Sequence, residues 1–484
     1  MLFNSYVFAL LFFPLCLIGY FGLNHCKQYR LGLVFLLGMS LWFYAFFNLK
    51  YLLIIMISVA VNYGIYCLFG KCGSSKLKKY ILLAGLTANL GVLMYYKYTD
   101  FFLENINLLF RTELPLQGIL LPLGISFFTF QQLSFLVDAY RGEVQNCDFL
   151  SYACFVTYFP QLIAGPIVTH DELIPQLQDP TKKTFNWDNF TPGMYMFALG
   201  MAKKVLLADT LGNAVNWGFA NVDALDATNA IITMLSYTLQ LYFDFSGYCD
   251  MAIGIGKMMN IDLPLNFNSP YKALTITEFW DRWHMTLTRF FTRYVYIPLG
   301  GNRKGATRTY VNIMIVFLLS GLWHGAGWTF VFWGACHGLF SVITRRFRSF
   351  FEAIHPALNW LLTFSFVNVM WVFFRADSFA TALKLLNRIA MLRFGAIRTE
   401  ILNCFKLVEI NYFIAKTPIE SIYTYFQLAV FFVLAMLIVL GCKNAHERMV
   451  AFRPTLGKAL ISAVLLTWCV FSFSGISTFL YFNF

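Results

Sequence analysis

Charged side chains are scarce in this chain. Asp, Glu, Lys and Arg together make up 12% of its 484 residues, about half the ~25% of ordinary soluble domains. Hydrophobic residues make up 59%, and the mean hydropathy is +0.62. This composition excludes a soluble domain and predicts an all-α, multi-pass membrane protein.

The signatures of several common chemistries are also missing. The sequence contains no GxxxxGK[ST] phosphate loop, no HExxH pair and no GxSxG turn, so ATP-driven transport, zinc proteolysis and serine hydrolysis lose their usual support. The 11 cysteines are scattered, without a CxxC pair or a Cys/His cluster at zinc spacing. We therefore expect no metal site and no tightly bound cofactor.

Acidic residues are fewer than basic ones: the chain has 24 Asp and Glu and 36 Lys and Arg, which gives a net charge of +12. In a soluble protein this excess would suggest nucleic acid, but no basic arm or aromatic–basic module is present. In a membrane protein it fits cytoplasmic loops that face anionic lipid. The expected partner of the basic residues is therefore the bilayer, and no nucleic acid.

Long apolar runs are abundant, and a membrane span needs about 20 such residues. Two apolar stretches are ambiguous: 150–168 holds the helix breakers of YFPQLIAGPI, and 193–220 carries Lys203 and Lys204 in mid-pattern. Clear candidate spans lie near residues 6–24, 31–48, 51–69, 80–97, 118–137, 229–247, 309–325, 327–344, 357–374, 424–441 and 457–475.

The basic loops predict an orientation. Lysines and arginines follow the first and third spans, and residues 272–308 hold seven basic side chains against two acidic ones, so these segments should be cytoplasmic. This orientation places both termini outside the cytoplasm. It also places residues 376–423 outside, although their six basic and four acidic residues are more typical of a cytoplasmic loop. Within it, 378–392 has the apolar spacing of an amphipathic surface helix. Residues 1–484 read as a single membrane domain.

One apolar stretch is unusually rich in polar and small residues. Ser320–Gly338 reads SGLWHGAGWTFVFWGACHG and sets His324 beside Trp323, among five glycines. Glycines let helices approach closely or break. A buried neutral imidazole can accept and return a proton, which makes His324 the first catalytic candidate. His337 need not share its site and could instead bond a neighbouring helix.

Three further features accompany that stretch. The segment 266–305 mixes aromatic and basic residues, with no part long enough to span, and carries His284; a structural role competes there with a functional one. The segment YFDFSGYCDMAIG contains Asp244 and Asp250. Asp244 is either a functional acid at membrane depth or a carboxylate at the cytoplasmic interface that caps a helix or pairs with a basic residue. For Asp250 we favour the interfacial role. The remaining histidines, expected to be solvated, are His25, His170, His355 and His446.

The stretch SGLWHGAGWTFVFWGACHG and the run EFWDRWHMTLTRFFTRYVYIPLGGNRKG together resemble the membrane-bound O-acyltransferase family. The segments YFDFSGYCDMAIG, YFPQLIAGPI, MAKKVLLAD and WVFFRAD match the same pattern, so the resemblance covers most of the chain. It is similar to the bacterial branch with alginate and peptidoglycan O-acetyltransferases and the teichoic-acid D-alanyl transfer protein. The fold implied is a ring of about 11–13 tilted helices around a thin core with a transmembrane tunnel.

The resemblance also implies a function. The enzyme would lie in the bacterial inner membrane and transfer an acyl group, which the resemblance suggests is acetyl. The donor would be a cytoplasmic thioester, either acetyl-CoA or an acylated carrier protein, and the acceptor an extracytoplasmic polysaccharide. The family's catalytic histidine falls on His324 and its second tunnel histidine on His284. Trp323 and Asp244 would line the tunnel. The donor would meet a basic face that includes Arg289, Arg293, Asn302 and Arg303, unless these residues only anchor a cytoplasmic loop.

Alternatives remain open at this stage. The chain could be a transporter with a polar path through its buried histidines and acid, or a family member that acylates a lipid or a protein. The branch resemblance further implies an exported SGNH-type partner outside. The terminal FLYFNF is either an aromatic membrane anchor or an acyl relay through Tyr481, whose phenol is more acidic than an alkyl alcohol.

Overall fold

The computed structural model describes residues 1–406, 420–474 and 480. Throughout this part of the chain every regular element is a helix, and the one β-bridge, between Phe267 and Trp283, stands alone. The chain folds as two compact units: Met1–Gly200, Tyr248–Leu265 and Met449–Phe484 form the first, and Met201–Gly247 with Asn266–Arg448 form the second. The all-α prediction is confirmed.

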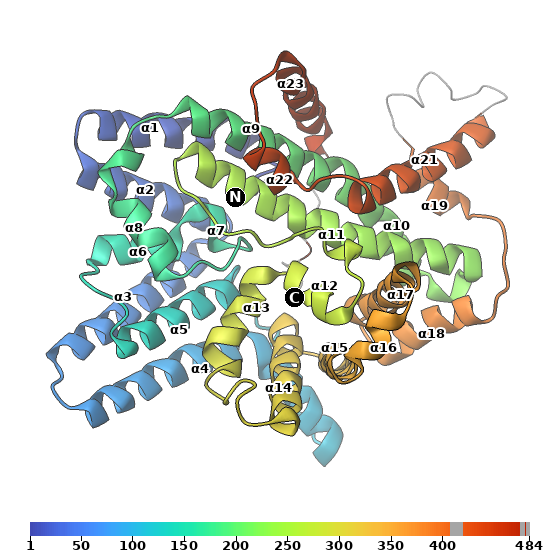
Figure 1. Ribbon diagram of the computed structural model, residues 1–484, viewed down its shortest axis with the longest axis horizontal. Coiled ribbons are helices and arrows are strands. Elements are labelled where there is room, and N and C mark those ends of the chain that lie inside the picture. Colours follow the sequence, from blue (N-terminus) through green and yellow to red (C-terminus); the bar gives the residue numbers. More distant parts are fainter. Residues whose placement is uncertain (407–419, 475–479, 481–484) are drawn as a thin grey trace. The chain divides into compact units, whose positions relative to one another are not determined.

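The helices of the first unit come mainly from the N-terminal two-fifths of the chain (Figure 1). They are η1 (Phe8–Phe12), α1 (Phe13–His25), α2 (Tyr29–Ala45), α3 (Leu49–Lys71), α4 (Ser75–Phe110), α5 (Ile125–Arg141), α6 (Phe149–Thr157), α7 (Phe159–Leu162), α8 (His170–Gln178), η2 (Pro180–Lys183), α9 (Trp187–Ala202), α23 (Leu456–Phe471) and η7 (Ser472–Ser474).

The second unit holds the segments that resemble the family. Its elements are η3 (Lys203–Ala208), α10 (Asp209–Ala220), η4 (Val222–Ala224), α11 (Ala227–Met258, which also enters the first unit), η5 (Pro270–Lys272), α12 (Ile276–Arg282), α13 (Met285–Phe291), η6 (Thr292–Tyr296), α14 (Ala306–His324), α15 (Trp328–Arg346), α16 (Arg348–Ala353), α17 (Pro356–Arg375), α18 (Phe379–Ala390), α19 (Thr399–Cys404), α21 (Glu420–Leu440) and α22 (Ala445–Val450).

Six helical segments are long and apolar enough to cross a bilayer, and α2 and α23 are apolar but shorter. Each of the eleven predicted spans contains a described helix, although α4 and α11 run well past the predicted ends and α5 begins at Ile125 rather than near 118. These findings make the chain a multi-pass membrane protein. The six are Phe8–His25, Leu49–Lys71, Ser75–Phe110, Ala306–His324, Pro356–Arg375 and Ile422–Leu440.

Both ambiguous stretches are helical but irregular. The first breaks at Tyr158, where ψ is 109° and α6 gives way to the single turn of α7, and residues 151–168 are buried. Protein rather than lipid therefore surrounds the broken backbone, as membrane depth requires. The second continues from α9 through the π-helix η3 into α10. The amphipathic helix predicted at 378–392 is α18.

Polar side chains hold the first unit's spans together. Asn62 of α3 donates to Asn89 of α4 at 3.1 Å and to Gln132 of α5 at 2.6 Å, and Asn89 donates back to Asn62 at 2.7 Å. Because lipid tails are as apolar as leucine, helices in a bilayer gain from such mutual hydrogen bonds and from close packing.

Glycines set the spacing of α14 and α15, the helix pair that carries His324 and His337. A Cβ on Gly321 would lie 2.4 Å from the carbonyl oxygen of Phe330, and a Cβ on Gly334 would lie 2.4 Å from that of Phe317. The two backbones therefore touch where no side chain fits between them. This contact fixes the position of the end of α14.

Candidate active site

His284 occupies a sharp bend between α12 and α13. Its backbone is left-handed, with φ 47° and ψ 50°, a conformation that costs a residue other than glycine about 1–2 kcal/mol. Two backbone hydrogen bonds hold the bend, from Asn268 N–H to Arg282 O at 2.9 Å and from Met285 N–H to Asn266 O at 3.0 Å. The strained bend therefore depends on the segment 266–268, and it aims the His284 side chain into the unit.

His284 and His324 form a buried pair. Their ring centroids are 6.3 Å apart, and their residues are 0% and 3% exposed. The Trp323 ring contacts both imidazoles, at 5.8 Å from His284 and 4.9 Å from His324. His284, His324 and Trp323, three of the residues predicted from the sequence, are therefore neighbours although two distant segments supply them.

Aromatic rings surround the pair. Phe245 of α11 lies edge-on to His284 at 4.9 Å, and Trp333 and Phe374 each lie 5.2 Å from His324. Burial among these groups disfavours charge, and it lowers the pKa of His284 well below its ordinary value. A neutral imidazole in an apolar setting is the form that a general base requires.

His337 lies outside this pair and has a structural partner. The indole N–H of Trp280, on α12, donates to its Nδ1 at 3.1 Å, and its residue is fully buried. The Trp333 ring lies edge-on to both histidines of the hairpin, 4.8 Å from His337 and 5.2 Å from His324. The hydrogen bond to a neighbouring helix agrees with the alternative predicted for His337.

Asp244 is part of a buried ion cluster. Lys204 Nζ lies 2.6 Å from its carboxylate and 2.8 Å from that of Asp209, and both Asp244 and Lys204 are almost fully buried. Asp244 is thus a paired carboxylate inside the unit, next in sequence to the Phe245 that contacts His284. Buried charges of this kind persist where partners compensate their desolvation.

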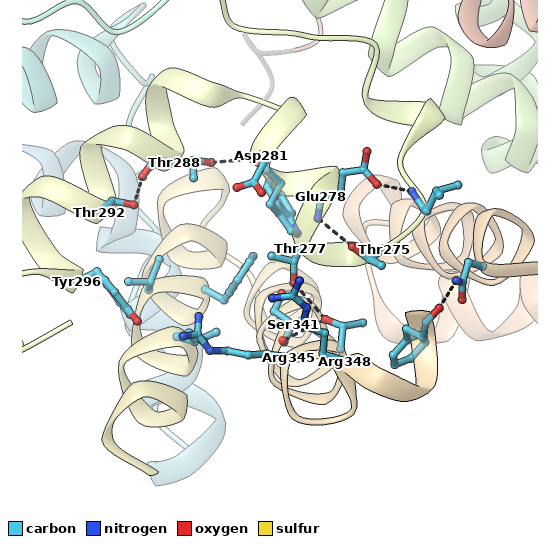
Figure 2. Close-up of a pocket in the computed structure, with 18 of the residues that line it drawn as sticks. Thr275, Thr277, Glu278, Asp281, Thr288, Thr292, Tyr296, Ser341, Arg345 and Arg348 are labelled. Carbon is cyan, nitrogen blue, oxygen red and sulfur yellow. Dashed lines mark hydrogen bonds between the residues drawn. The ribbon is translucent and has the colours of Figure 1, made fainter. Parts of the chain in front are cut away.

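A pocket of about 980 Å³ opens between α12, η6, α14, α15 and α16. Figure 2 shows Arg345 and Arg348 at this pocket, together with the hydroxyls of Thr277 and Ser341 and the carboxylate of Asp281. Ser320 also lines it, four residues before His324 on α14, which is about 6 Å along a helix. The pocket therefore reaches within one helical turn of the histidine pair.

The donor-binding residues predicted from the sequence lie elsewhere. Arg289 on α13, Arg293 in η6, and Asn302 and Arg303 in the following turn are absent from the lining of this pocket. Arg345 and Arg348 supply its guanidinium groups instead. In the sequence they are only basic residues that follow the apolar run 327–344. Tyr481 lies outside the described residues.

One histidine prediction is wrong. His170 is not solvated: it is 7% exposed, and its Nδ1 lies 3.4 Å from the buried carboxylate of Asp138. Packing of α8 against the end of α5 buries it, and the polar loop beside it in the sequence gave no sign of this packing.

The structure thus places two buried imidazoles among apolar helices beside a polar pocket, and comparison with known proteins specifies the family. Residues 89–380 match the profile of MBOAT, the membrane-bound O-acyltransferase family. The match spans more than half of the chain, so the chain belongs to this family and is an O-acyltransferase.

Named relatives extend the match beyond the profile. The chain is 44% identical over 417 residues to the peptidoglycan O-acetyltransferase of Helicobacter pylori, which covers 80% of this chain and 79% of the relative. It is 38% identical over 411 residues to the probable alginate O-acetylase of Pseudomonas aeruginosa, at 83% and 77% coverage. A more distant relative is the teichoic acid D-alanyltransferase of Bacillus subtilis, 27% identical over 261 residues, at 51% and 64% coverage.

Proposed function

We propose that this enzyme, in the bacterial inner membrane, transfers an acetyl group from a cytoplasmic thioester to an acceptor hydroxyl, and that the acetyl group finally reaches an extracytoplasmic polysaccharide. The observation that carries the proposal is the buried pair of His284 and His324, one helical turn from a pocket with two arginines. The activities for which the 44% and 38% identical relatives are named, on peptidoglycan and alginate, support acetyl as the group and a polysaccharide as the final acceptor.

His324 serves as the general base. Its imidazole takes the proton of the acceptor hydroxyl while the oxygen attacks the thioester carbonyl. The C–O bond forms, the C–S bond breaks, and the imidazolium returns its proton to the departing thiolate. The apolar rings around His324 exclude water, which would otherwise hydrolyse the thioester.

The pocket holds the thioester donor. Its volume lies near the upper end of the ~300–1,000 Å³ of ligand pockets, enough for an extended phosphopantetheine arm. Arg345 and Arg348 would pair with its phosphate, because guanidinium groups bind phosphate oxygens through two parallel hydrogen bonds. Acetyl-CoA and an acyl carrier protein share this arm, so both remain candidate donors.

The central test is His324→Gln in proteoliposomes, with acetyl-CoA and an acetylated carrier protein as separate donors. Loss of a general base costs ~10²–10⁴-fold in rate, so transfer to peptidoglycan or alginate fragments, measured with the exported partner present, should fall to near background. His337→Gln is the matched control: it replaces an equally buried histidine of the same hairpin and retains an acceptor for Trp280. Retention of more than about a tenth of the activity in His324→Gln would refute the role.

The donor site is tested by comparing two sets of arginines. Arg345→Gln and Arg348→Gln should raise the KM for the donor severalfold with little change in kcat, because they remove phosphate contacts made before and during the reaction. Arg289, Arg293 and Arg303 form the competing set predicted from the sequence, and their replacement by Glu tests that prediction. If only the second set raises the donor KM, the pocket is not the donor site.

Completion of the transfer involves an exported SGNH-type partner on the outer face, where the pattern of basic loops predicts both termini. Helix α18 is a docking candidate because it presents exposed Leu383 and Lys384 on an amphipathic surface. Tyr481 would relay the acyl group to that partner. Tyr481→Phe should abolish polymer acetylation if the relay operates, and should leave it intact if the tail is only an aromatic anchor.

A further inference from the structure

The side-chain oxygen of Asn266 lies among three hydrogen-bonding groups inside the second unit. The backbone N–H of Thr286 donates to Asn266 Oδ1 at 3.2 Å, the Thr286 hydroxyl donates at 3.0 Å, and His284 Nδ1 lies 3.1 Å away. Asn266 and His284 are both 0% exposed, and Thr286 is 2% exposed. A site this dry makes the direction of each hydrogen bond consequential.

The orientation of the amide follows from the backbone. The oxygen and nitrogen of an asparagine side chain look alike, and the hydrogen-bond network decides between them. A backbone N–H can only donate, so the atom that faces Thr286 N must be the oxygen. The same oxygen faces His284 Nδ1, and an oxygen can only accept. His284 Nδ1 must therefore carry a hydrogen.

We infer that Asn266 is a positioning residue that fixes His284 in its Nδ1–H tautomer and leaves Nε2 as a proton acceptor beside His324. A neutral imidazole has one N–H, so the second nitrogen presents a lone pair. The group that meets Nε2 must then be a donor, such as the acceptor hydroxyl of the substrate, because ring centroids 6.3 Å apart leave the two imidazoles too far for a direct hydrogen bond. In its neutral form His284 cannot donate from Nε2 to the oxyanion of the reaction.

The backbone around the pair makes this arrangement rigid. Asn266 accepts the N–H of Met285 through its main chain while its side chain holds Thr286 and His284, so one residue clamps the first turn of α13. Phe245 and Trp323 pack against the ring of His284, and the titratable side chain that faces it from α14 is His324. Rotation of the ring by a half turn would lose the contact with Asn266.

The chemical consequence rests on the proposed function. If His324 takes the proton of the hydroxyl, an acceptor at His284 Nε2 can align the same hydroxyl before attack. Geometry of this kind is worth large rate factors, since the wrong tautomer of a catalytic histidine costs up to about 10⁴-fold in kcat in a serine protease.

The first test reads the tautomer without any activity. Protein labelled with ¹⁵N in histidine is examined by NMR, and the His284 signals are assigned by their loss in His284→Gln. A protonated Nδ1 and an unprotonated Nε2 are expected. The opposite tautomer would overturn the inference even if acyl transfer is confirmed, and this readout stands if the proposed function fails.

The second test uses the pH dependence of kcat/KM. Asn266→Asp retains the accepting oxygen and adds a negative charge about 3 Å from the ring, which should raise the pKa of His284 by about 1–3 units. Since the neutral imidazole is the active form, the acidic limb of the profile should shift to higher pH, with kcat recovered above it. Asn266→Ala should lower kcat about 10- to 10³-fold with little change in donor KM.

Asn268→Asp is the matched control. Asn268 lies two residues away, where its side chain contacts Asn444, so the same change in charge should leave the acidic limb in place. An unshifted limb in folded Asn266→Asp, or an equal shift in Asn268→Asp, would show that Asn266 serves the fold alone.

Discussion

Replacement of Gly334 by alanine should cripple the enzyme while leaving it folded. The added Cβ would lie 2.4 Å from the carbonyl oxygen of Phe317, whereas ordinary contacts begin near 3.4 Å. Because the opposing atom belongs to the backbone, α14 and α15 must separate by about 1 Å. Trp333, the preceding residue on α15, packs on His324 at 5.2 Å, so the displacement acts directly on the proposed base.

Two opposing magnitudes decide the effect on stability. Overpacking costs about 1–3 kcal/mol, and alanine regains about 1 kcal/mol in helix propensity over glycine. The net loss is therefore at most about 2 kcal/mol. Activity is more sensitive, because a misplacement of ~1 Å can cost 10²-fold in rate. We expect a fall in kcat of about 10- to 100-fold with a small decrease in the unfolding temperature.

The assay measures release of thiol from the donor in proteoliposomes, beside thermal unfolding in detergent. Gly321→Ala should reproduce the effect, since its Cβ meets Phe330 O from the other side at 2.4 Å. Gly327→Ala is the control in the same hairpin: its nearest contact would be 3.5 Å, and its φ of −168° suits any residue. More than half of the wild-type rate in Gly334→Ala would refute the argument that this backbone contact positions His324.

Two further predictions concern buried ion pairs. Asp244→Asn should destabilise the protein by about 3–5 kcal/mol, since it leaves the Lys204 charge undercompensated, and the double variant with Lys204→Met should lose less; equal thermal unfolding of wild type and Asp244→Asn would contradict this. For His170, burial lowers the pKa, but the hydrogen bond and charge of Asp138 outweigh burial and raise it overall. A raised folded-state pKa stabilises below the unfolded value of ~6.5 and is lost as pH rises through the folded value. The deficit in unfolding temperature of His170→Gln should therefore be larger at acidic than at alkaline pH, and a constant deficit would exclude the pair.

Apolar length was sufficient to predict the helices. Each of the eleven stretches predicted to span the membrane contains a described helix, since a run of about 20 apolar residues has few other stable forms in a bilayer. Length did not give the end points: α4 continues to Phe110, and α11 to Met258, well past the predicted ends near 97 and 247. Polar residues beyond the apolar stretch can extend a helix, and a hydropathy profile does not detect that extension.

The histidine pair was predicted because each imidazole was exceptional in its surroundings. His324 stood in an apolar, glycine-rich stretch, and His284 in a motif shared with the family. Asn266 was missed because an asparagine in a loop is ordinary, and its role arises only when the chain returns 18 residues later to form the bend at His284. A sequence pattern does not show which distant residues come into contact when the chain folds back.

Buried charges were the hardest to assign. Lys204 was noted only as an oddity within a helical pattern, since its partner Asp244 lies 40 residues away on another helix. His170 was placed in solvent for the same reason, with Asp138 32 residues earlier. The sequence does not show whether a charged residue has an oppositely charged partner, because such partners are brought together only by tertiary packing.

The left-handed backbone at His284 also bears on how this enzyme can evolve. Asparagine, aspartate and histidine are the residues other than glycine that most often occupy this region of backbone space. The codons of asparagine and aspartate each differ from those of histidine by one base. A lineage can thus exchange the imidazole for an amide or a carboxylate in one mutational step without rebuilding the bend between α12 and α13, whereas a β-branched residue would have to remodel the backbone first. The shape of the main chain, before any demand of chemistry, sets which variants selection can sample here.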